Sequence, residues 1–362
     1  MIHDKKIRPI AFYLPQFYPT PENDEWWEPG FTEWTNVVRS KPLFRGHFQP
    51  NIPRDLGFYD LRVPETRIKQ ALLAQKAGIE GFCYWHYWFG NGRRLLSRVF
   101  EEVVSSGEPD FPFCLCWANH SWYKKTWDPT KPNTLLIEQT YPGITDYENH
   151  FYEMLPAFKD KRYMTSEDGR LIFGVFAPND NPDTSLFIDT WNRLSRENGL
   201  KGFYFFALAK FEKAVNSIYD KYDAIVYDAV DDAYYDMFSP CIESRWRNFN
   251  RKVLNRAYPV SYSKYVRFAL EAVHRHPKYI PCVNPNFDHT PRSGKSGIVF
   301  RGSTPQLWGR FCKDIVNLMT RENTPEGILF IKAWNEWAEG NYLEPDRRWG
   351  MAYIEEMAKA LL

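Results

Sequence analysis

The segment GILFIKAWNEWAEGNYLEP, residues 327–345, joins an apolar run to a polar turn that is rich in tryptophan. Seven earlier runs have the same short, apolar character and cover residues 8–16, 79–88, 111–119, 170–177, 202–209, 223–230 and 279–287. Near-continuous hydrophobicity is typical of strands that are covered on both faces, as in parallel sheets. With 327–335 as the eighth strand and helical patterns between the runs, the sequence predicts an α/β fold, a (β/α)8 TIM barrel.

Helix signals between these runs support the same architecture. Pro64 begins one predicted helix, since proline favours the first helical turn. Residues 95–104 repeat apolar side chains with helical spacing. Thr304, followed by a proline, predicts the start of another helix, and the last helix is expected near 349–361.

The 362 residues are expected to form one elaborated domain, 1–362, with long loops after strands one and six. Residues 17–63 make the first insertion, and their density of tryptophan, proline and glycine argues for order. Residues 231–278 make the second, with a basic run from Arg245 to Arg256 that we interpret as a solvated helix face. Long loops in compact domains are usually functional or disordered, which makes both insertions candidates for a role.

Charge and composition narrow the range of partners. A formal net charge of +1 argues against a nucleic-acid partner, which needs a basic face. The 14 Trp, 22 Tyr and 27 Phe exceed what one core requires, and flat aromatic rings suit the apolar faces of sugars. We therefore expect a polysaccharide or oligosaccharide substrate, with many of the rings still belonging to the core.

Cysteine usage and the N-terminus bear on location. The six cysteines form no CxxC pair, so we interpret them as reduced core residues, which suits the cytoplasm. The opening residues MIHDKKIRPIAFYLPQ contain no apolar leader, and no run is long enough to span a membrane. We expect a cytoplasmic location, although a chain trimmed of its leader would look the same.

Polar and aromatic residues gather after the carboxyl ends of the predicted strands, where barrel enzymes carry their active sites. The strand starts show no such clustering. The candidate substrate-binding residues are Tyr13, Gln16, Tyr84, His86, Tyr87, Trp117, Asn119, His120, Asp228, Asn286, Asp288, Asn335 and Trp337. This one-sided distribution predicts a binding site at that end of the barrel.

Glu336 and Glu339 are the candidate catalytic residues. Glycosidic cleavage needs one group that protonates the leaving oxygen and another that acts as nucleophile or base, and two carboxyl groups are the usual solution. Apolar walls, here Trp334 and Trp337, together with a like-charged neighbour raise one pKa, so one carboxyl is acid and the other base. Residues three apart point oppositely on an ideal strand, so a bulge or tight turn permitted by Gly340 must aim both at one pocket. The alternative for Glu339 is a helix-capping or arginine-paired role.

No motif for a metal or a phosphate group accompanies the two glutamates. The histidines show no HxH or HExxH spacing, and Gly-rich phosphate loops and GxSxG elbows are absent, so neither a metal nor a cofactor is expected. The residues therefore favour a glycoside hydrolase. Two alternatives stay open, a glycosyltransferase and a non-catalytic glycan-binding protein.

Several long motifs resemble the WbsX-like family. They are AFYLPQFYPTPENDEWWEPGFTEWTNV, KPLFRGHFQPNIPRDLGFYDLR, GFCYWHYWFGNGRRLL, FPFCLCWAN, LIEQTY and AWNEWAEGNYLEPD, from about residue 10 to the C-terminus. Members of that family are often encoded in bacterial polysaccharide gene clusters and are commonly labelled glycosyltransferases. Through WNEWxEG the sequence is also similar to glycoside hydrolase family 99, the endo-α-mannosidases and mannanases, which are retaining (β/α)8 enzymes without a metal.

The resemblance implies roles for individual residues. Glu336 would act as a base on the sugar's own 2-hydroxyl group, so that a 1,2-anhydro sugar forms, and Glu339 would protonate the leaving group and then activate water. Asn335 would hold a sugar hydroxyl or orient Glu336. The residues expected to contact the sugar are His86, Tyr84, Trp34 and Trp117. The likeness to family 99 implies retaining cleavage of an internal bond, whereas the family label implies assembly of O-antigen lipopolysaccharide or capsule.

Two segments depart from the family pattern. WANHSW stands where WANENW is common, which places His120 at the position of an acid, and PNFDHTPR stands where SWDNTPR is common. Both segments follow predicted strands at the expected rim of the site. They therefore bear on which substrate binds, and they could also signal weak activity.

Overall fold

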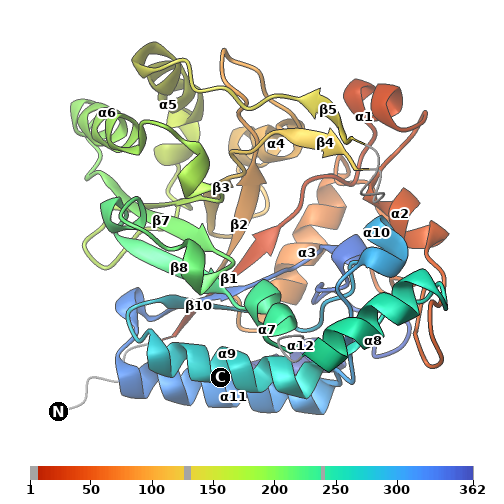
Figure 1. Ribbon diagram of the computed structural model, residues 1–362. Coiled ribbons are helices and arrows are strands. Elements are labelled where there is room, and N and C mark those ends of the chain that lie inside the picture. Colours follow the sequence, from red (N-terminus) through yellow and green to blue (C-terminus); the bar gives the residue numbers. More distant parts are fainter. Residues whose placement is uncertain (1–6, 126–131, 238–240, 362) are drawn as a thin grey trace.

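Eight parallel strands close into a barrel in the computed structural model, which describes residues 7–125, 132–237 and 241–361 (Figure 1). The strands are β1 (Arg8–Tyr13), β2 (Gly81–His86), β3 (Phe113–Trp117), β6 (Leu171–Val175), β7 (Phe203–Ala209), β8 (Ala224–Asp228), β10 (Ile280–Val283) and β12 (Ile328–Ile331). The last strand returns to the first, with Phe330 beside Ile10. The predicted (β/α)8 barrel is therefore confirmed. Each strand is shorter than its apolar run, and for every strand except β7 the run continues past the last strand residue.

The helices around the barrel follow the expected pattern. They are α3 (Pro64–Lys76), α4 (Arg98–Ser106), α5 (Ile144–Phe158), α6 (Thr184–Glu197), α9 (Tyr262–Arg275), α11 (Pro305–Glu322) and α12 (Ala352–Leu361). The Thr304 hydroxyl accepts a hydrogen bond from the Leu307 N–H at 3.2 Å, as an N-cap does. The apolar stripe from Leu95 begins before its helix, because Leu96 adopts a positive φ of 54° that interrupts helical backbone.

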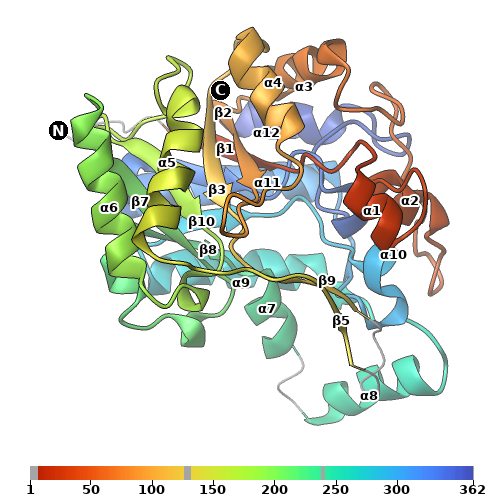
Figure 2. The same ribbon diagram turned by 90° about the horizontal axis from the view of Figure 1, so that it is seen from above.

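Both predicted insertions contain helices, and the second, 231–278, also includes α9, which is one of the helices around the barrel. Residues 17–63 contain α1 (Pro21–Trp26) and α2 (Glu33–Arg39), which lie beside α10 (Thr290–Ser293) in two views (Figures 1 and 2). After β8 come α7 (Val230–Asp236) and α8 (Cys241–Lys252), and α8 projects from the barrel (Figure 2). The basic run is thus helical as far as Lys252. A two-stranded antiparallel sheet that was not predicted follows β3, and its strands are β4 (Trp122–Lys124) and β5 (Thr134–Ile137).

The core accounts for much of the aromatic content. The largest fully buried side chains include Trp117, Trp191, Trp308, Trp334 and Trp337. The buried free thiols are Cys83, Cys114, Cys116, Cys282 and Cys312. This is the reduced, buried state that was predicted for these five, whereas the side chain of Cys241 lies outside the described part of the chain.

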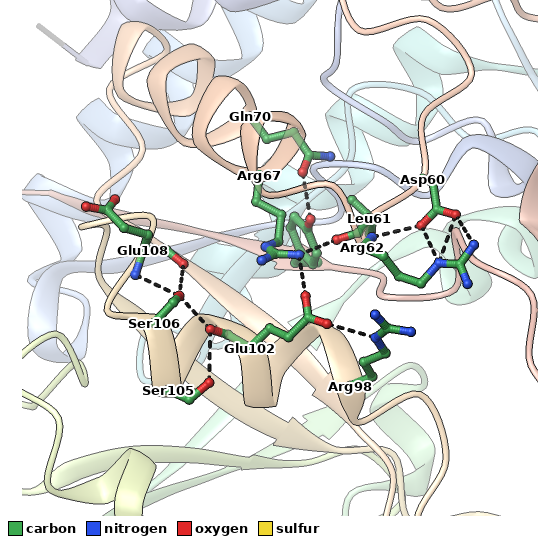
Figure 3. A network of polar contacts seen from close by, with 11 residues as sticks. Asp60, Leu61, Arg62, Arg67, Gln70, Arg98, Glu102, Ser105, Ser106 and Glu108 are labelled. Carbon is green, nitrogen blue, oxygen red and sulfur yellow. Dashed lines mark hydrogen bonds and ion pairs between the residues drawn. The ribbon is translucent and has the colours of Figure 1, made fainter.

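Arg67 on α3 joins the first insertion to α4 (Figure 3). Its Nη1 group donates hydrogen bonds to the Leu61 carbonyl at 2.6 Å and to Glu102 Oε2 at 2.9 Å. The Arg67 side chain is buried, so its loss removes the side-chain donor of the Leu61 carbonyl and the donor of Glu102 Oε2. We expect Arg67→Met to lower the free energy of unfolding by about 2–4 kcal/mol in urea denaturation.

Arg98 offers the matched control, because it donates to the same Glu102 carboxylate at 2.8 Å from an exposed position (Figure 3). Exposed pairs at this helical spacing contribute little, so Arg98→Met is expected to cost less than about 1 kcal/mol. Equal losses for the two variants would contradict the assignment of the stabilising contact to Arg67.

Candidate active site

A tight turn after β12 directs Glu336 and Glu339 into one cavity. Residues Trp337–Glu339 form a single 3₁₀ turn, and Gly340 closes it with a positive φ of 65°. Both glutamates line the same pocket. This is the kind of turn that their three-residue spacing requires.

Glu336 lies in apolar surroundings. Its Oε1 atom accepts a hydrogen bond from the indole N–H of Trp85 at 2.8 Å, and Trp85 stacks on Phe12 with ring centroids 4.5 Å apart. The preceding Asn335 donates to the Leu14 carbonyl at 2.9 Å and accepts from the Leu14 N–H at 2.7 Å. These two bonds tie the residue before Glu336 to the chain after β1.

Two cationic side chains hold Glu339. Arg292 on α10 donates to its Oε1 atom at 2.5 Å, and the Lys332 ammonium lies 3.6 Å from its Oε2 atom. Arg292 is held in turn by the buried Glu33 of α2 at 2.8 Å, and Lys332 by Asp228 at 3.3 Å. Glu339 is therefore paired with an arginine, as the alternative predicted, and the pair lies on the wall of the pocket.

These surroundings separate the proton affinities of the two carboxyl groups. Burial raises the pKa of Glu336, and the neighbouring charge of Glu339 raises it further, to about 7. Burial also acts to raise the pKa of Glu339, but Lys332 and Arg292 outweigh that effect and hold it well below its usual range. Near neutral pH Glu339 is therefore the ionised carboxylate of the pair, and Glu336 is the group that holds a proton more readily.

The cavity around the pair, here called the central pocket, has a volume of about 700 Å³. Its wall includes Leu14, Gln16, Trp27, Phe31, Glu33, Trp85, Tyr87, His120, Trp122, Phe176, Lys210, Arg292 and Lys332. The volume lies within the range of small-molecule sites, and aromatic rings alternate with charged groups. Such a lining suits sugars, whose rings have apolar faces and polar rims.

A buried network supports the turn from behind. The carboxylate of Glu344 accepts hydrogen bonds from Trp337 Nε1 at 2.6 Å, the Tyr59 hydroxyl at 2.8 Å and Gln70 Nε2 at 2.6 Å. The Tyr13 hydroxyl donates to Gln70 Oε1 at 2.7 Å. Burial raises the pKa of Glu344 to about 7 despite these donors. The network fixes the indole that lies between the two glutamates in sequence.

Five of the predicted substrate-binding residues line cavities. Gln16, Tyr87 and His120 line the central pocket together with the glutamates. Asn286 and Asp288 line a second cavity of about 260 Å³, here called the side pocket. The Asp288 N–H donates to the Glu339 carbonyl at 2.6 Å, so Asp288 contacts the turn Trp337–Glu339 from the side pocket.

The other predicted contacts lie in the packing around the central pocket. They are Tyr13, Trp34, Tyr84, His86, Trp117, Asn119, Asp228, Asn335 and Trp337. His86 contacts His150 of α5 at 2.7 Å and Tyr84 packs on Phe100 of α4, so both face helices. Adjacent strand residues point to opposite faces, and Trp85, between them, is the one that lines the pocket. None of these nine residues lines either of the two pockets described here, and their role in substrate binding stays a prediction.

Asn119 and Trp117 form hydrogen bonds within that packing. The Asn119 amide donates to the Ala177 carbonyl and accepts from the Ala177 N–H, both at 2.8 Å, which links the ends of β3 and β6. The indole N–H of Trp117 donates to the Trp88 carbonyl at 2.8 Å. These bonds hold the loops that carry the pocket wall.

Several pocket residues were missed by reasoning from the sequence. They are Glu33, Trp85, Lys210, Arg292 and Lys332, and Glu344, which supports the turn from behind, was missed as well. One signal was available, because Lys332 directly follows a wholly apolar strand, and a lysine in such a place requires an anionic partner. The pairing of Glu33 with Arg292 carried no local signal, because the two residues are 259 positions apart.

Gly340 provides a test of the turn. A Cβ atom at this position would lie 2.7 Å from the Asp288 Cβ and 2.9 Å from the Asp288 backbone nitrogen, and the positive φ adds strain. We expect Gly340→Ala to lower the free energy of unfolding by about 2–4 kcal/mol and to displace both glutamates. Gly199 has a φ of 78° with no atom within 4 Å of such a Cβ, so Gly199→Ala isolates the backbone strain. Urea denaturation should show the smaller loss, about 1 kcal/mol, for Gly199→Ala.

Among the described residues no group of three or more His, Cys, Asp or Glu side chains is arranged to hold a metal ion. Their helices include none that is long and apolar enough to cross a membrane. The reactive groups on the pocket wall are carboxyl, ammonium, guanidinium and imidazole groups.

A closed parallel barrel with two glutamates in an aromatic pocket is an arrangement that suits a carbohydrate-active protein. The chain belongs to the family described as Glycosyltransferase WbsX, which it matches over residues 9–357, and the resemblance noted in the sequence is confirmed. It is 34% identical over 354 residues to the protein WxcX of Xanthomonas campestris pv. campestris strain B100, and 35% identical over 358 residues to WxcX of strain ATCC 33913. Each match covers 97% of this chain and 49% of the relative, so the chain spans about half the length of these relatives.

Solved structures with the same architecture include two glycoside-hydrolase folds. A glycoside hydrolase-like protein superposes with a TM-score of 0.59 at 14% identity, covering 99% of this chain and 94% of that one. A family 99 endo-α-mannosidase from Bacteroides thetaiotaomicron, bound to Bis-Tris-propane, gives a TM-score of 0.55 at 15% identity, with 97% and 95% covered. At such identities the likeness establishes the shared fold alone.

Proposed function

We propose that the chain is a glycoside hydrolase that cleaves an internal bond of a bacterial polysaccharide or glycan with retention at the anomeric carbon. The observation that carries the proposal is the pair Glu336 and Glu339, which line one aromatic pocket and have opposite pKa shifts. One protonated and one ionised carboxyl is the arrangement that glycosidic cleavage needs. Membership of the WbsX family and the fold shared with the family 99 enzyme agree with a carbohydrate substrate.

The electrostatics favour Glu336 as the acid of the first step. Its carboxyl gives a proton to the leaving oxygen as the bond from that oxygen to C1 breaks, and the Glu339 carboxylate takes the proton of the sugar's 2-hydroxyl as O2 bonds to C1. A 1,2-anhydro sugar results. Water then attacks C1 as the C1–O2 bond breaks, its proton passes to the Glu336 carboxylate, and Glu339 returns its proton to O2. Two inversions at C1 give net retention.

This assignment exchanges the roles that the family resemblance implies. The reason is local, because Lys332 and Arg292 stabilise the charged form of Glu339, whereas no cation lies within ion-pair distance of Glu336 among the described residues. A group held in its ionised state is a poor proton donor near neutral pH. We therefore place the transferable proton of the free enzyme on Glu336.

The pH dependence of kcat/KM tests the assignment. Glu336 must be protonated to act as the acid, and its pKa is raised to about 7, so activity is expected to fall as the pH rises through about 7. Glu339 must be ionised, and its pKa is held low, so the acid limb is expected below the ordinary range of a glutamate. A rate that increases as pH rises from 6 to 9, on the order of tenfold, would contradict the placement of the proton.

The proposed function is tested by incubating the purified protein with polysaccharide from the organism that makes it, beside Glu336→Gln, and following the products by mass spectrometry. Fragments from the wild type alone are expected. Fragments of equal yield from the variant would show that the cleavage does not depend on this carboxyl pair.

The family description favours a second candidate, a glycosyltransferase that assembles O-antigen or capsule. The same incubation distinguishes it when a nucleotide sugar and an acceptor are added. Extension of the acceptor without fragmentation would support transfer and reject hydrolysis. Retention of glycans without any turnover would support a binding protein.

A further inference from the structure

One wall of the central pocket carries a cationic corner formed by Lys210, His120 and Phe176. Lys210 follows β7, His120 lies in the turn after β3, and Phe176 follows β6, which lies between those strands in the barrel. The Lys210 ammonium lies 4.3 Å from the centroid of the Phe176 ring, and the His120 ring centroid lies 4.9 Å from it. All three residues line the pocket that contains the two glutamates.

Lys210 differs in its ion-pair partners from Arg292 and Lys332, the two cations that contact Glu339. Arg292 is committed to Glu33 and Glu339, and Lys332 to Asp228 and Glu339. Within the part of the chain that the structure describes, no carboxylate lies within 4.0 Å of the Lys210 ammonium. A positive charge at a pocket wall without such a partner is costly unless an anion completes it.

The surroundings of Lys210 confirm that it is poorly compensated. Burial lowers its pKa, and the nearby Lys332 lowers it further. Asp231, Glu339 and Asp228 are the acidic groups that face it, and they act from beyond ion-pair distance. None of these acids is in ion-pair contact with the ammonium, so among the described residues the Lys210 charge meets the pocket without a direct partner.

His120 adds a hydrogen-bonding atom to the same corner. Its Nδ1 atom is buried and has no hydrogen-bond partner among the described residues. Burial lowers the pKa of His120 to about 4, and Lys210 contributes to that shift, so the imidazole is neutral at pH 7. A neutral imidazole with one N–H can donate a hydrogen bond to an anion beside the ammonium.

The corner also lies close to the reaction centre. Phe176 contacts the ring of Trp85 edge-on at 5.5 Å, and Trp85 donates its indole hydrogen bond to Glu336. The rings offer an apolar face for the C–H bonds of a sugar. A sugar ring packed there would present a negative substituent to Lys210 while its glycosidic oxygen lies toward Glu336.

We propose that the substrate is an acidic glycan, and that Lys210 and His120 bind the negatively charged substituent of one of its sugars. The substituent that we assign to this site is the carboxylate of a uronic acid. This inference rests on the proposed function. It selects one class of glycan from those that the hydrolytic proposal allows. A carboxylate fits because it accepts one bond from an ammonium and another from an imidazole N–H.

The inference is tested by binding in the Glu336→Gln background, where turnover is blocked. The probes are matched sets of oligosaccharides with the same linkages: a uronic-acid oligosaccharide, its carboxyl-reduced neutral form, a sulfated form, and a nucleoside diphosphate sugar. We expect at least one uronic-acid member to bind about tenfold or more tightly than its neutral form. Lys210→Met should remove that preference, and Lys210→Arg should restore most of it.

Lys213 gives the matched control, because its ammonium also lies over a ring, 5.7 Å from the Phe211 centroid, but it is exposed and lies outside the pocket wall. Lys213→Met should keep the preference for the acidic member. Equal binding of neutral and acidic members overturns the inference, as does a preference that survives in Lys210→Met. Retention only of the sulfated form or of the nucleotide sugar through Lys210 overturns the carboxylate assignment.

A panel that retains no acidic member also overturns the inference. It leaves the hydrolytic proposal standing, since that proposal is judged by cleavage of the native polysaccharide. Conversely, cleavage that is absent while the acidic preference depends on Lys210 rejects the hydrolase and keeps the anion site. The two claims therefore fail separately.

Discussion

Glu336→Gln and Glu339→Gln should each reduce cleavage of the glycan by roughly 100- to 10,000-fold, with little change in thermal stability, when initial rates are compared with the wild type. Glutamine preserves the size of the side chain and removes the transferable proton or the negative charge. Both residues line the central pocket, and neither supports the barrel through a strand hydrogen bond. A variant that retains full activity would exclude its residue from the reaction.

The two variants should differ on substrates with an activated leaving group. Such a group departs without a proton, so the variant that lacks the acid recovers activity, whereas the variant that lacks the base does not. Because the pKa of Glu336 is raised and that of Glu339 is held low, we expect recovery for Glu336→Gln. Recovery for Glu339→Gln instead would restore the roles that the family resemblance implies.

Arg292→Met should lower kcat roughly 10- to 100-fold near pH 7 and move the acid limb of the pH profile upward. Arg292 donates to Glu339 at 2.5 Å and is one of the two cations that keep this carboxyl ionised. Its loss raises the pKa of Glu339, so a larger share of the enzyme carries the proton on the wrong carboxyl. A merely structural role for Arg292 would lower the amount of folded enzyme without moving the profile.

Two further variants serve as comparisons for Arg292→Met. Glu33→Gln removes the second partner of Arg292, which lies 2.8 Å away, and keeps the bond to Glu339, so its profile should shift less. Arg310 is exposed on α11, so Arg310→Met is the control for loss of an arginine and should leave the pH profile unchanged. An unchanged profile in Arg292→Met would contradict the assigned origin of the low pKa of Glu339.

The barrel was predictable because its strands are marked by composition. Apolar runs separated by capped helices, such as the one that begins at Thr304, report local propensity and need no knowledge of partners. The strand ends were less certain, because a run such as 279–287 continues past β10, which ends at Val283. The β4–β5 pair was missed, because its strands are short and partly exposed.

The site was predictable only in part, for two physical reasons. The strands of a parallel barrel are buried on both faces, so the sequence GFCYWH does not reveal that Trp85 faces the pocket while Tyr84 and His86 face helices. The charges that set the state of Glu339 also come from distant segments, and no local pattern pairs Glu33 with Arg292. The carboxyl pair itself was visible, since both of its members lie in one turn.

The most direct test of the account is hydrolysis in ¹⁸O-labelled water. The wild-type protein is incubated with an acidic polysaccharide from its own organism, and the fragments are analysed by mass spectrometry. The account predicts one heavy oxygen atom at each new reducing end, with no labelled fragments from Glu336→Gln. An absence of fragments, with acceptor extension once a nucleotide sugar is supplied, would contradict it.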